Sequence, residues 1–110
     1  MTRWGISILL LLVTAFPVTA ALRLVPTDYP SIQAAINAAS NGDVVLVKDG
    51  TYHENIDFLG RDITVRSVGG HESCTIDGGG TGEVVKLVGS ESASAVLRGF
   101  TITNGRGHGG

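Results

Sequence analysis

Apolar residues recur at intervals of twenty residues through most of this 110-residue chain, and that spacing constrains the fold more than any other feature. A meander of antiparallel strands has no reason to keep a constant interval, whereas a coil in which each turn stacks on the one before it does. Two separate series in one register indicate that every twenty-residue unit contributes at least two short strands. The series are Val45, Val65 and Val85, then Ile56, Ile76 and Val96, with Val44, Thr64 and Val84 and with Val47, Ser67 and Leu87 beside the first; Leu24 and Val25 precede Val44 and Val45 by the same interval.

The strands of such a coil bury alternate side chains, which predicts an all-β fold of the parallel β-helix type. Stacked strands lie about 4.8 Å apart, so inward aliphatic residues form continuous columns, while Thr64, Arg66 and Lys86 are expected to face outward. Glycines mark the corners at which the chain turns. They are Gly69, Gly70, Gly78, Gly79, Gly80, Gly89 and Gly105.

One helix is predicted, over residues 30–42. Pro30 suits a first helical position, and Asn41 and Gly42 tolerate the left-handed backbone at which helices often end. The helix presents a single apolar stripe made of Ile32, Ala35, Ile36 and Ala39. We expect it to cover the first turn of the coil, where unpaired strand edges would otherwise be exposed.

The first twenty residues have the composition of a secretory signal peptide. Arg3 precedes an unbroken apolar run at residues 8–13, Pro17 follows the run, and small residues permit cleavage after Ala20 or Ala21. The run is too short to span a bilayer of about 30 Å as a helix, so no transmembrane anchor is expected in this segment. These residues predict a secreted protein with an extracellular, bacterial cell-surface or outer-membrane location.

Charge and cysteine content narrow the possible partners. The chain carries 8 Lys and Arg against 10 Asp and Glu, a formal net charge of −2, and this balance gives no reason to expect nucleic acid or anionic lipid as a partner. The single cysteine, Cys74, excludes an intrachain disulfide, and we interpret it as a small buried apolar residue.

The stretch "YPSIQAAINAASNGDVVLVKDGTYHENI" resembles the N-terminal cap and first turn of right-handed parallel β-helix proteins of the pectin-lyase-like superfamily. "VLRGFTITNG" is similar to the repeat of secreted bacterial β-helix proteins, including polymorphic outer-membrane proteins. The resemblance covers the chain from Val25 onward and implies a fold more specifically than an activity. With the signal peptide at 1–20, the predicted organisation is an N-terminal segment with a capping α-helix at 21–42 and the first β-helix turns at 43–110. Because no cap follows the last turn, the sequence predicts a fragment of a longer chain.

The pectinesterases of this superfamily begin with Gly-x-Tyr-x-Glu, a signature present here as Gly50, Tyr52 and Glu54. The resemblance implies that the catalytic residues of such esterases, and the calcium-binding acids of pectate lyases, would come from later turns. No residue of this chain is therefore assigned a catalytic role. For the signature we predict structural roles, with Tyr52 packed at a corner and Glu54 accepting backbone hydrogen bonds.

Asp57 and Asp77 are the candidates for metal binding, because a twenty-residue register would stack them about 5 Å apart. Two carboxylates at that distance could bind calcium; the alternative is solvated acids at turns or strand edges, and no other cofactor is expected. His53, His71 and His108 lack the spacing of a metal site and are predicted to be loop histidines. The "GRGHGG" at 105–110 matches a dinucleotide-binding pattern only formally, because no helix can follow it, and we interpret it as a corner.

Two functional hypotheses remain. In the first, the chain belongs to a non-catalytic adhesin or structural scaffold that binds a polysaccharide or a cell-surface partner. In the second, it is the N-terminal part of a carbohydrate-active enzyme, of pectinesterase or polysaccharide lyase type, whose catalytic residues lie beyond Gly110. The "GFTITNG" repeat favours the first and "GTYHEN" favours the second, so the sequence leaves open whether the full-length protein is an enzyme.

Overall fold

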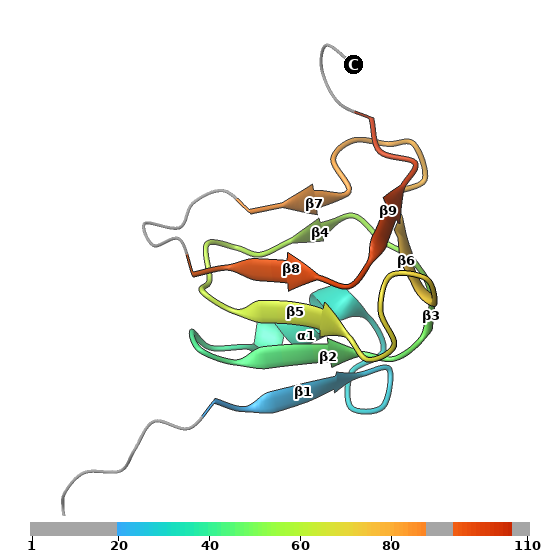
Figure 1. Ribbon diagram of the computed structural model, residues 1–110. Helices are drawn as coiled ribbons and strands as arrows, with labels where there is room; N and C mark the ends of the chain where they lie inside the picture. Colours follow the sequence, from blue (N-terminus) through green and yellow to red (C-terminus); the bar gives the residue numbers. More distant parts are fainter. Residues whose placement is uncertain (1–19, 88–93, 107–110) are drawn as a thin grey trace, which may run out of the picture.

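The computed structural model describes residues 20–87 and 94–106 and shows a parallel β-solenoid of about three turns (Figure 1). Its strands pair only in parallel within these ranges, as the repeat predicted, and form three sheets: sheet A in the order β1-β2-β5-β8, sheet B in the order β3-β6-β9 and sheet C in the order β4-β7. The elements are β1 (Leu22–Val25), α1 (Ile32–Ala38), β2 (Val44–Val47), β3 (Gly50–His53), β4 (Ile56–Asp57), β5 (Thr64–Ser67), β6 (Cys74–Asp77), β7 (Val85–Lys86), β8 (Val96–Arg98) and β9 (Thr101–Thr103).

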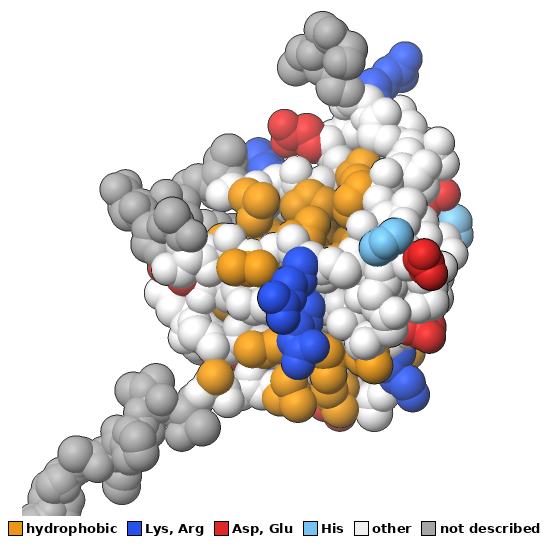
Figure 2. Space-filling model, viewed as in Figure 1, with side chains coloured by type: hydrophobic (Ala, Val, Ile, Leu, Met, Phe, Trp, Pro, Cys, Tyr) orange, Lys and Arg blue, Asp and Glu red, His pale blue; other side chains and the backbone are white. Residues whose placement is uncertain are grey.

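The core lies between the three sheets and follows the period-two alternation of the strands. In β5, Val65 and Ser67 are buried, whereas Thr64 and Arg66 remain partly exposed on the outer side. Lys86 on β7 is exposed as well, so these outward residues lie as predicted. The outer side of sheet A faces the viewer in Figure 2. The largest fully buried side chains are Phe58, Ile32, Ile36, Ile56, Ile63, Ile76, Val25, Val45, Val47, Val65 and Cys74.

The constant twenty-residue register is correct only for the pairing of β2 with β5, where Val45 lies opposite Val65 and Val47 opposite Ser67. Elsewhere the interval is longer, because the corners differ in length: two residues join β2 to β3, and six join β5 to β6. A longer corner adds residues between one strand and the strand that stacks on it. Corners of unequal length therefore give unequal intervals in the sequence. The observed intervals are 22 residues for Leu22 and Val44, 24 for Tyr52 and Ile76, 26 for Ile76 and Ile102, 29 for Ile56 and Val85, and 32 for Val65 and Leu97.

These intervals correct part or all of each of the four predicted columns, and also the predicted pairing at the start of sheet A. Val85 stacks on Ile56 rather than on Val65. The predicted series of Ile56, Ile76 and Val96 is divided among three sheets, since the three residues lie on β4, β6 and β8. At the start of sheet A, Leu24 and Val25 pair with Leu46 and Val47, two residues later than predicted, and the predicted places of Val84 and Leu87 above Val44 and Val47 are wrong for the same reason.

The helix is shorter than the predicted range of 30–42. Ser31 is the N-cap, and its hydroxyl accepts a hydrogen bond from the amide of Ala34 at 3.1 Å, so Pro30 precedes the helix instead of opening it. The helix ends when the amide of Ala39 turns back to the carbonyl of Ile36, and Gly42, with φ of 92°, belongs to the turn that leads into β2. The apolar stripe is confirmed: Ile32, Ala35, Ile36 and Ala39 are all buried, and α1 packs against β1, β2 and β4.

Candidate functional site

The three signature residues lie on β3 and directly after it, and their side chains serve the fold. Tyr52 lies in the inward column with Ile76, and its hydroxyl donates a hydrogen bond to the carbonyl of Lys48 at 2.9 Å. Partial burial of its ring raises the pKa of the Tyr52 phenol. Gly50, with φ of 149°, is the first residue of β3 and takes a backbone conformation that suits glycine where the chain leaves the corner.

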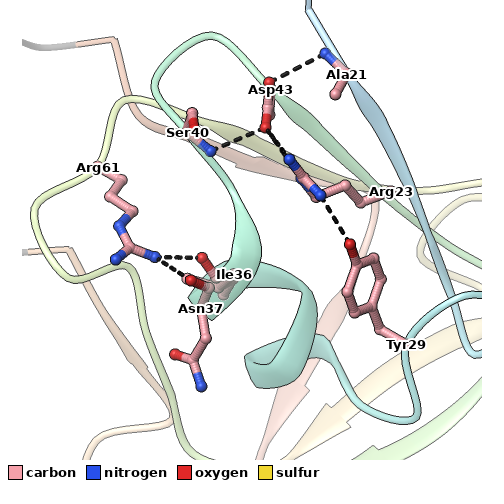
Figure 3. A network of polar contacts seen from close by, with 8 residues as sticks. All are labelled: Ala21, Arg23, Tyr29, Ile36, Asn37, Ser40, Asp43 and Arg61. Atoms are coloured by element: carbon pink, nitrogen blue, oxygen red, sulfur yellow. Dashed lines mark hydrogen bonds and ion pairs between the residues drawn. The ribbon is translucent and has the colours of Figure 1, made fainter.

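Glu54 and Arg61 hold the two ends of α1. The Glu54 carboxylate accepts hydrogen bonds from the amides of Ile32 at 2.9 Å and Gln33 at 3.0 Å, as the structural interpretation of the signature predicted. At the other end, Arg61 Nη1 donates to the carbonyls of Ile36 at 2.6 Å and Asn37 at 2.9 Å (Figure 3). An acid at the N-terminus and a base at the C-terminus both oppose the partial charges of the helix ends.

Gln33 covers the free edge of β4. Its carboxamide oxygen accepts from the amide of Asp57 at 2.7 Å, and its Nε2 donates to the carbonyl of the same residue at 3.0 Å. The backbone amide and carbonyl of Asp57 point away from β7, and the Gln33 side chain bonds to both of them as a neighbouring strand would. Sequence reasoning missed both Gln33 and Arg61, because their partners are about 24 residues away and belong to no local motif.

A second polar network anchors β1. The Asp43 carboxylate accepts from the amides of Ser40 and Ala21 and from Arg23 Nε, and Arg23 also donates to the hydroxyl of Tyr29 at 2.7 Å (Figure 3). The Asp43 side chain is only 7% exposed. The amides of Ser40 and Ala21, followed by the Arg23 guanidinium, hold the pKa of Asp43 below its usual value, and Asp43 with Tyr29 raises the pKa of Arg23. The network joins β1 to the turn between α1 and β2. Both oxygens of the Asp43 carboxylate accept hydrogen bonds from the protein.

The stacking of Asp57 on Asp77, on which the expectation of a calcium site depended, does not occur. Asp57 lies opposite Lys86 in sheet C, whereas Asp77 lies between His53 and Thr103 in sheet B. The stacking of the two acids required the constant interval of twenty residues, which the unequal corners remove. Within the described ranges no three His, Cys, Asp or Glu side chains gather where they could hold a metal ion.

The outer side of sheet B brings together polar side chains that the sequence analysis did not connect. All of its outward positions carry a hydroxyl, an imidazole or a carboxylate, and they alternate with Tyr52, Ile76 and Ile102, of which Ile76 is fully buried. A threonine therefore lies opposite a threonine on both neighbouring strands. Each strand has a threonine two residues before another polar residue. The interval is 24 residues from β3 to β6 and 26 from β6 to β9, so the repetition is not apparent in the sequence. The sheet B outer face consists of Thr51 and His53 on β3, Thr75 and Asp77 on β6, and Thr101 and Thr103 on β9.

Asp77 is the most ordered acceptor on this face. Its Oδ1 accepts from Asn104 Nδ2 at 3.0 Å and from the amide of Gly79 at 2.9 Å, while its Oδ2 lies 3.7 Å from Nδ1 of His53. The hydrogen bond from Asn104, that from Gly79 and the nearby His53 lower the pKa of Asp77. Gly78 permits this arrangement, since a Cβ there would lie 3.0 Å from the carbonyl of Asn104. Asp77 thus presents an oriented, ionised carboxylate beside an imidazole that is 76% exposed.

The remaining candidate residues are not brought to this face as reactive groups. Cys74 is a free, buried cysteine, as predicted, and burial raises the pKa of its thiol. His71 lies in the exposed corner between β5 and β6, where its carbonyl accepts a hydrogen bond from Thr101. His108, Gly89, most of the "GRGHGG" segment and the predicted signal peptide up to residue 19 lie outside the described residues.

None of the helices in the described ranges has the length and apolar character needed to cross a membrane. Comparison with family profiles, with curated proteins and with solved structures finds no match to this chain.

Proposed function

We propose that this chain is the N-terminal part of an exported, right-handed parallel β-helix that acts as a non-catalytic, polysaccharide-binding scaffold. The parallel solenoid supports the β-helix, and connections between parallel strands are nearly always right-handed. The contacts of α1 with β1, β2 and β4, together with Gln33 on the edge of β4, are those expected of a cap on the first turn.

The observation that carries the proposal is the sheet B outer face. Threonine hydroxyls both donate and accept hydrogen bonds, and an ionised carboxylate accepts strongly from sugar hydroxyls. Asp77 is oriented by Asn104 and by the amide of Gly79 before any ligand arrives, which reduces the ordering cost of binding. This face carries no Lys or Arg, so we expect it to bind neutral polysaccharide in preference to polyuronate.

The enzyme hypothesis has less support from the structure. Its sequence argument was the Gly50, Tyr52 and Glu54 signature, and the side chains of Tyr52 and Glu54 bond to backbone groups of the fold. A catalytic acid must reach the substrate, whereas Glu54 is occupied by the first amides of α1.

Affinity electrophoresis of the full chain in gels that contain glucan, mannan, xylan or polygalacturonate tests the proposal. We expect retardation by at least one neutral polymer, and we expect Asp77→Asn to weaken that binding about tenfold, since a hydrogen bond to a charged group is lost. Glu83→Gln is the matched control, because it removes one exposed acid outside the sheet B outer face.

Migration that none of the four polymers changes would refute polysaccharide binding, and equal loss in the Glu83→Gln control would refute the role of Asp77. A separate assay tests the proposal that the protein is non-catalytic. Release of reducing ends or of methanol from pectin by the exported protein would contradict it.

A further inference from the structure

The outer side of sheet A is unusual for a strand surface that meets solvent. Alternation normally places polar residues outward when the inner side is packed on a core. Here five of the eight outward positions are aliphatic, two are arginine, one is threonine and none is acidic. The sheet A outer face consists of Leu22 and Leu24 on β1, Val44 and Leu46 on β2, Thr64 and Arg66 on β5, and Val96 and Arg98 on β8.

The aliphatic part of this face is continuous and accessible. Leu22 is 56% exposed and lies opposite Val44, while Leu24 lies opposite Leu46 on the same two strands. Figure 2 shows these hydrophobic side chains gathered over β1 and β2, below a column of basic side chains over β5 and β8. Contiguous apolar surface of this kind marks a site of interaction.

The basic part of the face calls for an anion. Arg66 and Arg98 lie directly opposite each other on paired strands, and like charges in that position destabilise a sheet. Within the described residues neither guanidinium makes a hydrogen bond or an ion pair with the protein. The planar guanidinium group binds phosphate and carboxylate in a two-pronged fashion, so an external anion would remove the repulsion.

We propose that the sheet A outer face docks on an anionic membrane surface. Lipid phosphates would meet Arg66 and Arg98, and the aliphatic side chains of β1 and β2 would enter the headgroup region. A fluid lipid surface requires cations and apolar area but no matched hydrogen-bonding groups, and this face offers only Thr64 as an uncharged polar side chain.

Other occupants fit the face less well. Protein interfaces are typically enriched in tyrosine and tryptophan, and neither occurs among the eight positions. A second copy related by two-fold symmetry would bring no acid to either arginine, because the face contains none. The inference is independent of the polysaccharide site, which lies on a different sheet.

Co-sedimentation of the full chain with vesicles tests the inference, using phosphatidylcholine alone and phosphatidylcholine mixed with phosphatidylglycerol. We expect stronger binding to the mixed vesicles and a decline as salt is raised. Each arginine near an anionic surface should account for about fivefold in binding, so Arg66→Gln/Arg98→Gln should weaken it about twenty-five-fold. The apolar segment at residues 8–13 is present in every variant, so its own affinity for lipid cancels in the comparison.

The double variant Lys86→Gln/Arg106→Gln is the matched control, because it removes the same charge from exposed positions outside the sheet A outer face. We expect it to change binding less than about twofold. Leu46→Gln should weaken binding without changing its salt dependence, since it removes apolar contact only.

Equal binding to the two kinds of vesicle, or equal losses in the arginine and control variants, would overturn the proposal. So would a rise in melting temperature with inorganic phosphate that depends on the two arginines but comes without vesicle binding, because it would indicate a soluble anion. Asp77→Asn should leave vesicle binding unchanged, so that failure of the polysaccharide proposal and failure of this one are separable. Circular dichroism of each variant shows whether it is folded.

Discussion

The outer faces of sheets A and B arise from the same turns of one solenoid, yet they carry opposite chemistry. The sheet A outer face is aliphatic and cationic, whereas the sheet B outer face is built from hydroxyls, an imidazole and an oriented carboxylate. Both faces cover the same core, in which Val65 and Ile76 are fully buried. Packing therefore fixes the inward residues of each strand and leaves the outward ones free to differ, so the outward residues are where function should be sought.

The largest expected effect tests whether inward and outward positions are independent. Val65→Asp places an unpaired charge in the core and should cost more than about 4 kcal/mol, enough to abolish cooperative unfolding. Arg66→Gln, one residue along the same strand, should leave the melting temperature nearly unchanged because Arg66 faces outward. Thermal melting followed by circular dichroism measures both, and a folded Val65→Asp protein would contradict the stacked core.

The next prediction uses β1, which belongs to sheet A, to test whether the two faces bind their ligands independently. Asp43 fastens β1 by accepting from the amide of Ala21 and from Arg23, so Asp43→Asn should lower the free energy of unfolding by about 3 kcal/mol. Loosening of β1 should also weaken vesicle binding, since Leu22 and Leu24 belong to that strand, while polysaccharide binding at Asp77 persists. Parallel loss of both activities would show that the two faces are not separable.

The same variant has a pH signature. The pKa of Asp43 is lowered in the folded protein from its ordinary value of 3.8, so its contribution to stability is full above that value. It is lost as the pH falls through the lower folded pKa. Urea unfolding at neutral and at acid pH should therefore show a smaller loss of stability on acidification in Asp43→Asn than in the wild type. Equal losses would indicate that other carboxylates govern unfolding in acid.

A third test uses acid to distinguish the faces in the wild-type protein. Hydrogen bonds from Asn104 and Gly79 lower the pKa of Asp77 below its ordinary value of 3.8. Polysaccharide binding should hold steady as the pH falls from 7 to about 5 and should drop about tenfold only when Asp77 becomes protonated. Affinity electrophoresis in buffers of decreasing pH measures this, and a decline between pH 7 and about 5 would contradict the role of the Asp77 carboxylate.

The sequence was sufficient for the architecture and insufficient for the register. Alternation within strands such as β2 and β5 follows from side-chain geometry, and parallel stacking follows from repetition, so both were predictable. The lengths of the corners were not, because a corner of two residues and a corner of six can both return the chain to the next turn. That single uncertainty displaced Val85 and broke the predicted pairing of Asp57 with Asp77.

The same uncertainty concealed both candidate faces. Arg66 and Arg98 are 32 residues apart, and Asp77 and Asn104 are 27 apart, so no local motif connects either pair. The signature at Gly50, Tyr52 and Glu54 was visible because it is local, and its Tyr52 and Glu54 side chains bond to backbone groups of the fold. In a solenoid with unequal corners, local motifs thus report on structure, while ligand sites depend on pairings that only the three-dimensional structure reveals.

The smallest expected effect examines whether the hydroxyls of the sheet B outer face act as a set. Thr75 lies between Thr51 and Thr101 on paired strands, and Thr75→Val removes its hydroxyl while it keeps the β-branched shape that strands favour. The free energy of unfolding should change by less than about 0.5 kcal/mol, whereas polysaccharide binding should fall a few-fold, by about the value of one neutral hydrogen bond. Vesicle binding should not change, because Thr75 lies on sheet B. If Thr75→Val binds polysaccharide as the wild type does, the ligand contacts only the Asp77 end of the face, and the threonine ladder is a strand surface without a role in recognition.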